Sequence, residues 1–160
     1  MAVVFVVAGV GLLIRYVFVT SADEAATASA PRISDVAFEQ GATAVCKRYI
    51  DVFDTATTLV HLASKEQTGD FLESIARSFD QMVVSLRAVP IAAIPGDRAP
   101  IEQWLADWEA YDAYGHRYAA AVRVGGERDL VAHDKTTIDG LLRRRNGFAR
   151  ANHLSACAFH

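Results

Sequence analysis

Histidines and carboxylates are the residues of this chain whose chemistry could support catalysis or hold a metal ion. The five histidines lie apart in the sequence, with no two of them at i, i+4 and none in an HExxH pattern. Metal sites that can be read from a sequence depend on such close spacing, because the ligands must share one helix face or one loop. The histidines are His61, His116, His133, His153 and His160. We therefore predict no metal ligand and no cofactor.

Carboxylates gather in one segment and include a pair at i, i+3 spacing. They are Glu102, Asp107, Glu109 and Asp112. Acid–base catalysis needs such groups beside a placed histidine or a second acidic helix, and the sequence indicates neither. The chain also contains no GxSxG, no glycine-rich phosphate loop and no CxxC. We predict that the protein is not an enzyme and assign no catalytic residue. An enzyme that uses His116 or His133 with nearby carboxylates is the weakest hypothesis.

The two cysteines have the arrangement of a structural disulfide. Cys46 lies early in the region that follows the N-terminal apolar stretch, and Cys157 lies almost at the C-terminus. This separation is not that of a metal or redox motif. By the chain-entropy model, closing a loop of about 110 residues would stabilise the fold by roughly 4–5 kcal/mol at most. Such bridges persist mainly outside the reducing cytosol. The alternative, two unrelated buried thiols, stays open.

An aromatic stripe provides the first group of candidate interface residues. Trp104, Trp108 and Tyr111 begin the stripe, which continues to Tyr114 and Tyr118. Such a stripe most often packs in a core. The tyrosines spread over more than one helix face, however, so that one side could anchor a partner.

Three consecutive arginines provide the second group. Arg143, Arg144 and Arg145, joined by Arg150, form the basic cluster of the chain. On a domain held near a membrane, such a cluster can contact lipid phosphates or an acidic partner. A solvated helix face is the competing interpretation. We keep the three arginines as interface candidates.

The N-terminal segment predicts the element that would hold these groups near a membrane. Ala2 to Val19 is apolar apart from Arg15 and small residues. As a helix it covers roughly 27 Å, close to the roughly 30 Å hydrocarbon thickness of a bilayer. We predict a single transmembrane helix over 1–20, followed by a polar tether over 21–30. A signal peptide cleaved after Ala28 and a buried core helix are the alternatives.

Small residues and charges in this segment carry further predictions. Gly9 and Gly11 would let the helix approach a partner helix closely. Arg15 lies near the end of the span, where its long side chain reaches the interface. The positive-inside rule favours a cytoplasmic body, because Arg15 and Arg32 follow the apolar stretch and no basic residue precedes it. The cysteines favour an extracytoplasmic body, because structural disulfides persist mainly outside the cytosol. We expect an extracytoplasmic domain, and a basic region upstream of Met1 would remove the conflict.

Residues 31–160 are predicted to form one all-α domain. The chain is 52% hydrophobic with a net charge of −3, which suits a folded, mildly acidic protein and excludes a bulk nucleic-acid partner. Apolar residues recur every three or four positions, and no stretch alternates with the period of two that strands require. We predict an antiparallel bundle of about four helices. Breaks are expected at Thr68-Gly69-Asp70, with Asp70 and Glu73 as a capping pair, at Pro90 to Pro100, at Gly125-Gly126 and at Asn146-Gly147.

Three segments carry a resemblance: RSFDQMV, PIEQWLADWEAY and NGFARANHLSACAF. The last contains a Phe-Ala-Arg-x-Asn stretch, Phe148 to Asn152, and a Ser-x-Cys-x-Phe tail, Ser155 to Phe159. In these segments the chain resembles small, uncharacterised, membrane-anchored helical envelope proteins of actinobacteria. The resemblance implies that Cys46 and Cys157 are paired and that the protein lies in the envelope. It implies no active-site residues.

These features favour a non-catalytic, single-pass envelope protein that acts as an accessory or stabilising subunit. Its expected partners are an integral membrane protein complex, of which a respiratory supercomplex is one candidate, and the lipid bilayer, but not nucleic acid. The alternative is an extracytoplasmic helical module that binds an apolar or lipid ligand between its helices, because the chain has an unusually aromatic helix.

Overall fold

The structure, a computed structural model, describes residues 21–58 and 64–158, with side chains for residues 25–49 and 64–158. The transmembrane helix predicted over 1–20 lies outside these residues, together with Gly9, Gly11 and Arg15. Within the described residues, no helix combines the length and the apolar character that crossing a bilayer requires. The anchor therefore stays a prediction.

The described part of the chain is helical and contains no strand, as the periodicity predicts. Its elements are α2 (Ser21–Ser29), α3 (Val36–Thr58), α4 (Lys65–Arg87), α5 (Arg98–Val124), α6 (Glu127–Ala151) and the 3-10 turn η1 (Ser155–Cys157). Residues 21–30, predicted to be a tether, are instead occupied mostly by α2, which packs on α6.

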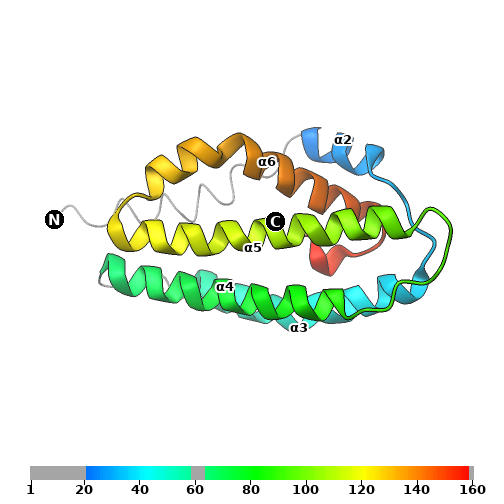
Figure 1. The fold of residues 1–160 in the computed structure, drawn as a ribbon, viewed down its shortest axis with the longest axis horizontal. Helices are drawn as coiled ribbons and strands as arrows, with labels where there is room; N and C mark the ends of the chain where they lie inside the picture. The colour runs from blue at the N-terminus through cyan, green and yellow to red at the C-terminus, as the bar shows by residue number, and fades with distance from the viewer. Residues whose placement is uncertain (1–20, 59–63, 159–160) are drawn as a thin grey trace.

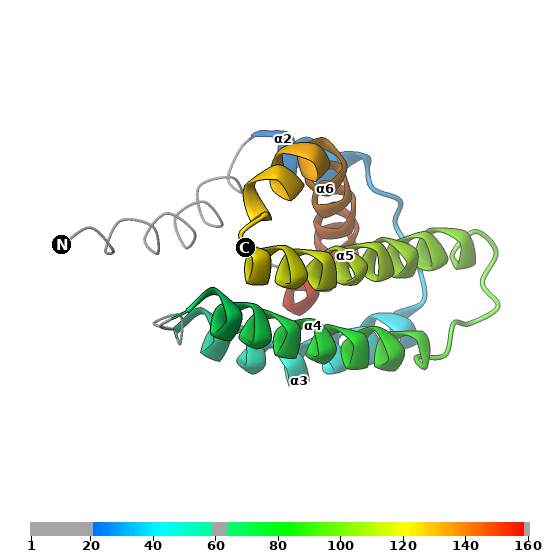
Figure 2. The ribbon, with the colours of Figure 1, turned by 60° about the vertical axis from the view of Figure 1, so that its left-hand side comes forward.

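Helices α3 to α6 run antiparallel to their neighbours in the chain and form a compact bundle (Figure 1). Helix α5 lies between two layers, with α3 and α4 on one side and α2 and α6 on the other (Figure 2). The most extensive interface joins α4 and α5, whereas α3 packs on α4 and η1, and α6 packs on α5 and α2. The predicted helix bundle is confirmed. It is not a plain four-helix bundle, because α2 and η1 cover surfaces of α6 and α3.

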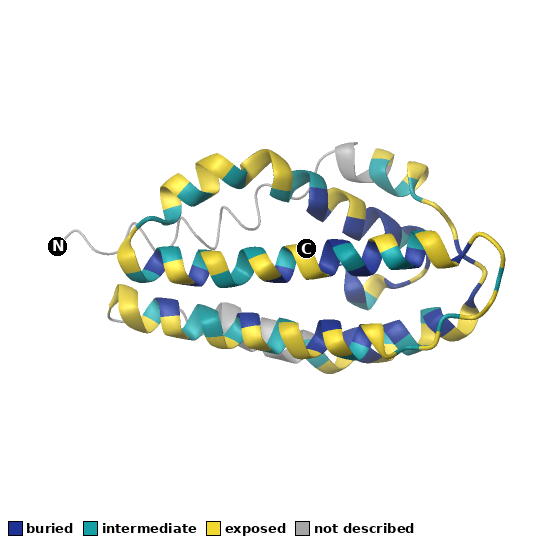
Figure 3. Ribbon diagram, viewed as in Figure 1, coloured by how far each residue is buried: buried dark blue, intermediate teal, exposed yellow. Residues whose placement is uncertain are grey.

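The apolar core occupies the half of the bundle where α3 and α5 begin and where α4 and α6 end (Figure 3). The ring of Trp104 packs edge-on against Phe38, with centroids 6.1 Å apart, and stacks on Phe148 at 5.4 Å. Phe79 and Trp108, at 6.0 Å, extend this aromatic packing along α4 and α5. Burial of these large rings is the main source of stability in this half, because each removes a large apolar area from water.

A disulfide joins Cys46 on α3 to Cys157 in η1, and both cysteines are fully buried. The two Cα atoms lie 5.3 Å apart although the residues are 111 positions apart in sequence. The predicted bridge is confirmed. It holds the C-terminal tail against α3, where Leu154 and Ala158 join the core.

Buried polar side chains hold the segment that joins α2 to α3. Asn152 accepts a hydrogen bond from the backbone N–H of Ile33 (2.8 Å), and its amide nitrogen donates to the carbonyl of Pro31 (3.0 Å). Asp97 accepts from the backbone N–H of Ser34 (2.7 Å). Asn152 ends the Phe-Ala-Arg-x-Asn stretch. Its contacts give that stretch a structural role, because they connect the C-terminal end of α6 to the segment that leads into α3.

Helix α4 begins earlier than the sequence suggests. It starts at Lys65, and the Ser64 hydroxyl caps it by accepting a hydrogen bond from the backbone N–H of Gln67 (3.2 Å). The break expected at Thr68-Gly69-Asp70 is wrong, and so is the capping pair of Asp70 and Glu73, because both lie inside the helix.

Gly69 and Gly147 serve close helix packing. A Cβ at Gly69 would lie 3.0 Å from the carbonyl oxygen of Ala119 on α5, and one at Gly147 would lie 2.8 Å from that of Ala26 on α2. Glycine alone lets these backbones approach so closely. Helix α6 therefore continues through Asn146-Gly147, and the stop predicted there is wrong. The stop at Gly125 is confirmed, since that residue adopts a left-handed φ of 74°.

Candidate functional site

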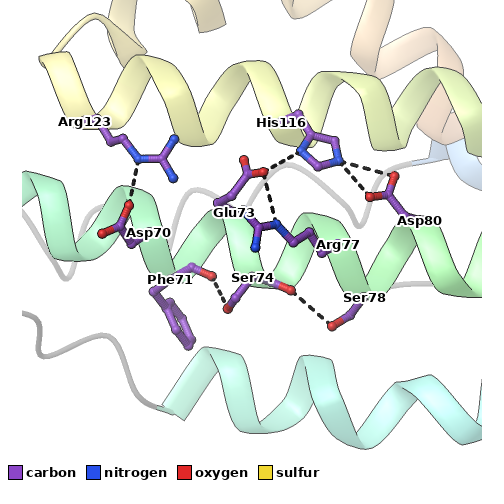
Figure 4. Close-up of polar contacts among 9 residues, drawn as sticks. All are labelled: Asp70, Phe71, Glu73, Ser74, Arg77, Ser78, Asp80, His116 and Arg123. Carbon is purple, nitrogen blue, oxygen red and sulfur yellow. Dashed lines mark hydrogen bonds and ion pairs between the residues drawn. The ribbon is translucent and has the colours of Figure 1, made fainter.

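A cluster of titratable side chains lies between α4 and α5. His116 of α5 faces two carboxylates of α4 (Figure 4): Nδ1 lies 3.2 Å from Oε1 of Glu73, and Nε2 lies 3.2 Å from Oδ2 of Asp80. Partial burial lowers the pKa of His116, but its hydrogen bonds to Glu73 and Asp80 outweigh burial, and the pKa is raised overall. The imidazolium form can donate to both carboxylates at once.

Asp112 completes the cluster. It lies one turn before His116 on α5, and its side chain is buried with 9% exposure. Ligand atoms of Asp80, Asp112 and His116 all lie within 4.8 Å of one another. Burial raises the pKa of Asp112 to about 7, and the hydrogen bond and charge of Asp80 add to the rise. The same hydrogen bond lowers the pKa of Asp80. The two carboxyl groups therefore share a proton near neutral pH.

Helix periodicity explains how these side chains meet. Asp112 and His116 are at i, i+4 and share one face of α5. Glu73 and Asp80 are seven residues apart, about two turns, and share one face of α4. The long α4–α5 interface holds the two faces against each other. Gly69 contributes to this geometry, because its missing side chain lets α4 lie close to α5.

Two ion pairs lie beside the cluster. Arg77 faces the cluster from α4, with Nε 3.5 Å from Oε1 of Glu73. One turn before Glu73 on α4, Asp70 accepts a hydrogen bond from Nε of Arg123 at 2.9 Å (Figure 4). Exposed ion pairs of this kind each contribute less than about 1 kcal/mol. One imidazole among several carboxylates supports two kinds of chemistry: proton transfer near neutral pH and coordination of a cation.

The tryptophans predicted as interface candidates lie in the core. Trp104 and Trp108 are 1% and 0% exposed, and the indole N–H of Trp104 donates to the backbone carbonyl of Arg145 at 3.2 Å. Tyr111 is half-buried and packs edge-on against Phe79 at 5.7 Å. In the folded domain the tryptophans cannot anchor a partner, because α5 directs them inward.

Arg145 is fully buried, so its assignment to a surface cluster is wrong. Its guanidinium carbon lies 4.0 Å from the ring centroid of Trp108 and 4.3 Å from that of Tyr111. Desolvation lowers the pKa of Arg145 to about 10, and it therefore stays charged at neutral pH. Desolvated cation–π contacts are worth about 2 kcal/mol or more. The error follows from treating the three arginines as one surface run, since Arg145 lies three and four residues after the buried Leu142 and Leu141 and shares their face of α6.

The other two arginines remain at the surface but differ in their contacts. Arg144 makes a two-pronged ion pair with the buried carboxylate of Asp107, Nη2 to Oδ1 at 2.7 Å and Nε to Oδ2 at 3.1 Å. Arg143 is exposed. Arg143 is thus the member of the predicted cluster whose charge is most accessible to a partner.

The two histidines of the enzyme hypothesis have different surroundings. His116 belongs to the α4–α5 cluster, whereas His133 is exposed on α6 and contacts its neighbour Asp134, with Nδ1 to Oδ1 at 2.6 Å. The structure does not bring the two together. Sequence reasoning named His116, Asp112 and Glu73 but placed them in separate groups, and it did not name Asp80. One signal was present, the i, i+4 spacing of Asp112 and His116; the α4 partners depend on how two helices pack.

Comparison with protein-family models, with curated proteins and with solved structures finds no match for this chain.

Proposed function

We propose that this chain is a non-catalytic accessory subunit whose helical domain lies outside the cytosol, is held at the membrane by residues 1–20, and docks on a larger integral membrane protein complex. A respiratory supercomplex is one candidate. The buried bridge between Cys46 and Cys157 is the observation that carries the proposal. Structural disulfides persist where cellular reductants do not reach them, and the apolar N-terminal segment gives a reason for membrane attachment.

The first half of α6 is the docking surface in this proposal. All buried residues of α6 lie at or after Leu141, so residues 127–140 bury no side chain (Figure 3). Helical stability in proteins comes mostly from packing of an apolar face. The first half of α6 has little such packing within the domain. Val131 there is 42% exposed, and Val124 at the nearby end of α5 is 84% exposed. A partner that covers these valines would supply the missing contacts.

Cross-linking of the intact protein tests the proposal. The full chain would carry a photoreactive residue at Val131, and a matched variant would carry it at Gln81, which is exposed on α4. After cross-linking in membranes and extraction in mild detergent, we expect an adduct with one integral membrane protein from position 131 and none from position 81. Equal adducts from both positions, or a protein that always purifies alone at monomer size, would contradict the proposal.

The alternative function, binding of an apolar or lipid ligand, depended on the aromatic helix. Trp104 and Trp108 instead fill the core by packing on Phe38, Phe79 and Phe148. No observation on the described residues favours this alternative over the accessory role.

A further inference from the structure

We propose that Asp80, Asp112 and His116 bind a divalent first-row transition-metal ion, with Zn²⁺ as the reference ion, and that Glu73 orients the imidazole for it. This inference does not depend on the proposed function. It concerns the α4–α5 interface, whereas the docking surface lies on α6.

The donor set has the composition and spacing that such an ion requires. Ligand atoms of Asp80, Asp112 and His116 lie within 4.8 Å of one another. At metal–ligand distances of about 2.0–2.2 Å, two donors on one ion lie roughly 3.3 to 4.2 Å apart. Side-chain rotations that move the ligand atoms by about 1 Å would therefore bring all three atoms into coordination distance, without movement of either helix. One imidazole and two carboxylates would leave the remaining positions to water, as in open zinc sites.

Asp112 points to a ligand independently of this spacing. It is 9% exposed, and its Oδ1 is buried and accepts no hydrogen bond from the described residues. A buried carboxylate oxygen without a donor costs about 1–3 kcal/mol. Asp112 also lies beside Asp80, and ligand atoms of the two carboxyl groups lie within 4.8 Å of each other. A cation between them would give the buried Oδ1 atom of Asp112 the partner that it lacks among the described residues.

Glu73 provides the second feature expected of a metal site. Histidine ligands usually donate the N–H of their other ring nitrogen to a carboxylate, which fixes the tautomer and the ring orientation. Nδ1 of His116 lies 3.2 Å from Oε1 of Glu73, while Nε2 faces Asp80 (Figure 4). Glu73 is itself held by Arg77. The imidazole is thus already turned with Nε2 toward Asp80.

The choice of ion follows from the ligands. Imidazole nitrogen favours zinc and its transition-metal neighbours, whereas Mg²⁺ and Ca²⁺ prefer sites made of oxygen. His116 and Asp80 are partly exposed, so the ion would enter from solvent and exchange. We therefore expect binding by Zn²⁺ and Co²⁺ that Mg²⁺ does not displace.

Metal titration of the full chain tests this site. Tag-free protein in detergent, stripped with a chelator and dialysed, would be titrated with Zn²⁺ by calorimetry and with Co²⁺ by visible absorption. We expect one equivalent to bind. Asp112→Asn and His116→Gln should each weaken Zn²⁺ binding at least about tenfold, and Glu73→Gln by about tenfold through lost orientation. The matched control His133→Gln removes an exposed histidine beside an aspartate and should bind as wild type does.

Thermal unfolding in chelator separates loss of the site from loss of the fold. Asp112→Asn keeps the shape of the side chain and removes a buried charge, so the metal-free variant should unfold no earlier than wild type. Zn²⁺ should raise the unfolding temperature of wild type and of His133→Gln, but not that of Asp112→Asn. The proposal is overturned if stripped wild type binds no Zn²⁺ at about 100 μM, if Mg²⁺ competes equally, or if the three cluster variants bind as tightly as wild type.

Discussion

The two halves of the bundle are held together by different forces. Where α5 begins and α6 ends, large apolar side chains pack around Trp104 and Trp108, and the Cys46–Cys157 bridge crosses the same region. Where α4 begins and α5 ends, the buried apolar residues are smaller, such as Ala76, Ala119 and Val122, and polar contacts join the two helices beside them. His116 meets the carboxylates of α4, and Arg123 pairs with Asp70. In the first region the packing responds little to solvent conditions, and in the second it depends on protonation and ions.

This difference assigns the two regions different roles. Apolar burial is non-directional and proportional to area, so the core region supplies most of the stability. Charged contacts near the surface supply little net free energy and change with pH, salt and bound ions. The polar region can therefore respond to a ligand without loss of the fold, because the core and its disulfide hold the helices in register.

Removal of the disulfide should have the largest effect. We expect Cys46→Ala together with Cys157→Ala to lower the free energy of unfolding by about 4 kcal/mol, since a loop of 111 residues is no longer closed. Urea unfolding of the detergent-solubilised chain measures this. A reductant should reproduce the loss in wild type and leave the double variant unchanged. A loss below about 1 kcal/mol would mean that the apolar packing alone holds this region.

The same substitution in the two regions should have unequal costs. Leu86 is fully buried near the end of α4, and its replacement by alanine should lower the free energy of unfolding by about 3 kcal/mol. Leu72 is half-buried near the beginning of α4, and its replacement by alanine should lower the free energy of unfolding by about 1 kcal/mol. Paired urea unfolding curves compare Leu86→Ala with Leu72→Ala. Equal losses would show that the polar half of α4 is packed as tightly as the core half.

Asn152→Ala tests the polar contacts that close the core region. The change leaves the buried N–H of Ile33 without its acceptor and the carbonyl of Pro31 without its donor. We expect a loss of about 2 kcal/mol. Hydrogen exchange should report faster exchange of the Ile33 amide in the variant. If that amide exchanges as slowly as in wild type, the side chain does not protect it.

Asp112 should make the metal-free protein less stable as pH rises. Its folded pKa of about 7 lies above its unfolded value near 4, so the fold holds the proton more tightly and loses stability between these pH values. The raised pKa of His116 acts in the same direction: its contribution is present below pH about 6.5 and is lost as pH rises through the folded pKa. Asp80, with a lowered pKa, loses its contribution only as pH falls below about 4.

Measured in the presence of a chelator, the variant Asp112→Asn isolates the contribution of Asp112 to the pH dependence of stability. Relative to wild type, the variant should gain stability between pH 4 and 7, on the order of 1 kcal/mol, and the gain should level off above pH 7. Glu73 and Arg77 also face the cluster, and both residues are present in the two proteins compared. Thermal or urea unfolding across this pH range measures it. Parallel pH profiles for the two proteins would show that Asp112 titrates normally.

Much of the fold could be predicted from local patterns. The apolar period near 3.6 predicts the helices, and Ala42, Val45 and Cys46 lie buried on α3 as that period requires. Helix ends were less predictable. Gly69 and Gly147 lie in short sequences that are typical of helix ends, yet they allow close contacts with α5 and α2. A glycine alone cannot distinguish these uses, because both follow from its missing side chain.

The candidate site was less predictable than the fold. Spacing within α5 brings Asp112 beside His116, but Glu73 and Asp80 come from another helix. Their arrival depends on the register of α4 against α5. Arg145 shows the same limit, since a run of three arginines gives no sign that the third lies on aromatic rings inside the core.

The sequence by itself determined that residues 31–160 are helical, that their helices bury apolar faces against one another, and that the cysteines suit a long-range bridge. These properties follow from periodicity and composition, which act along the chain. The tertiary structure alone decided which charged groups are buried and which carboxylates face His116. Those properties depend on the distance and rotation between packed helices, and contacts between residues far apart in the sequence set both.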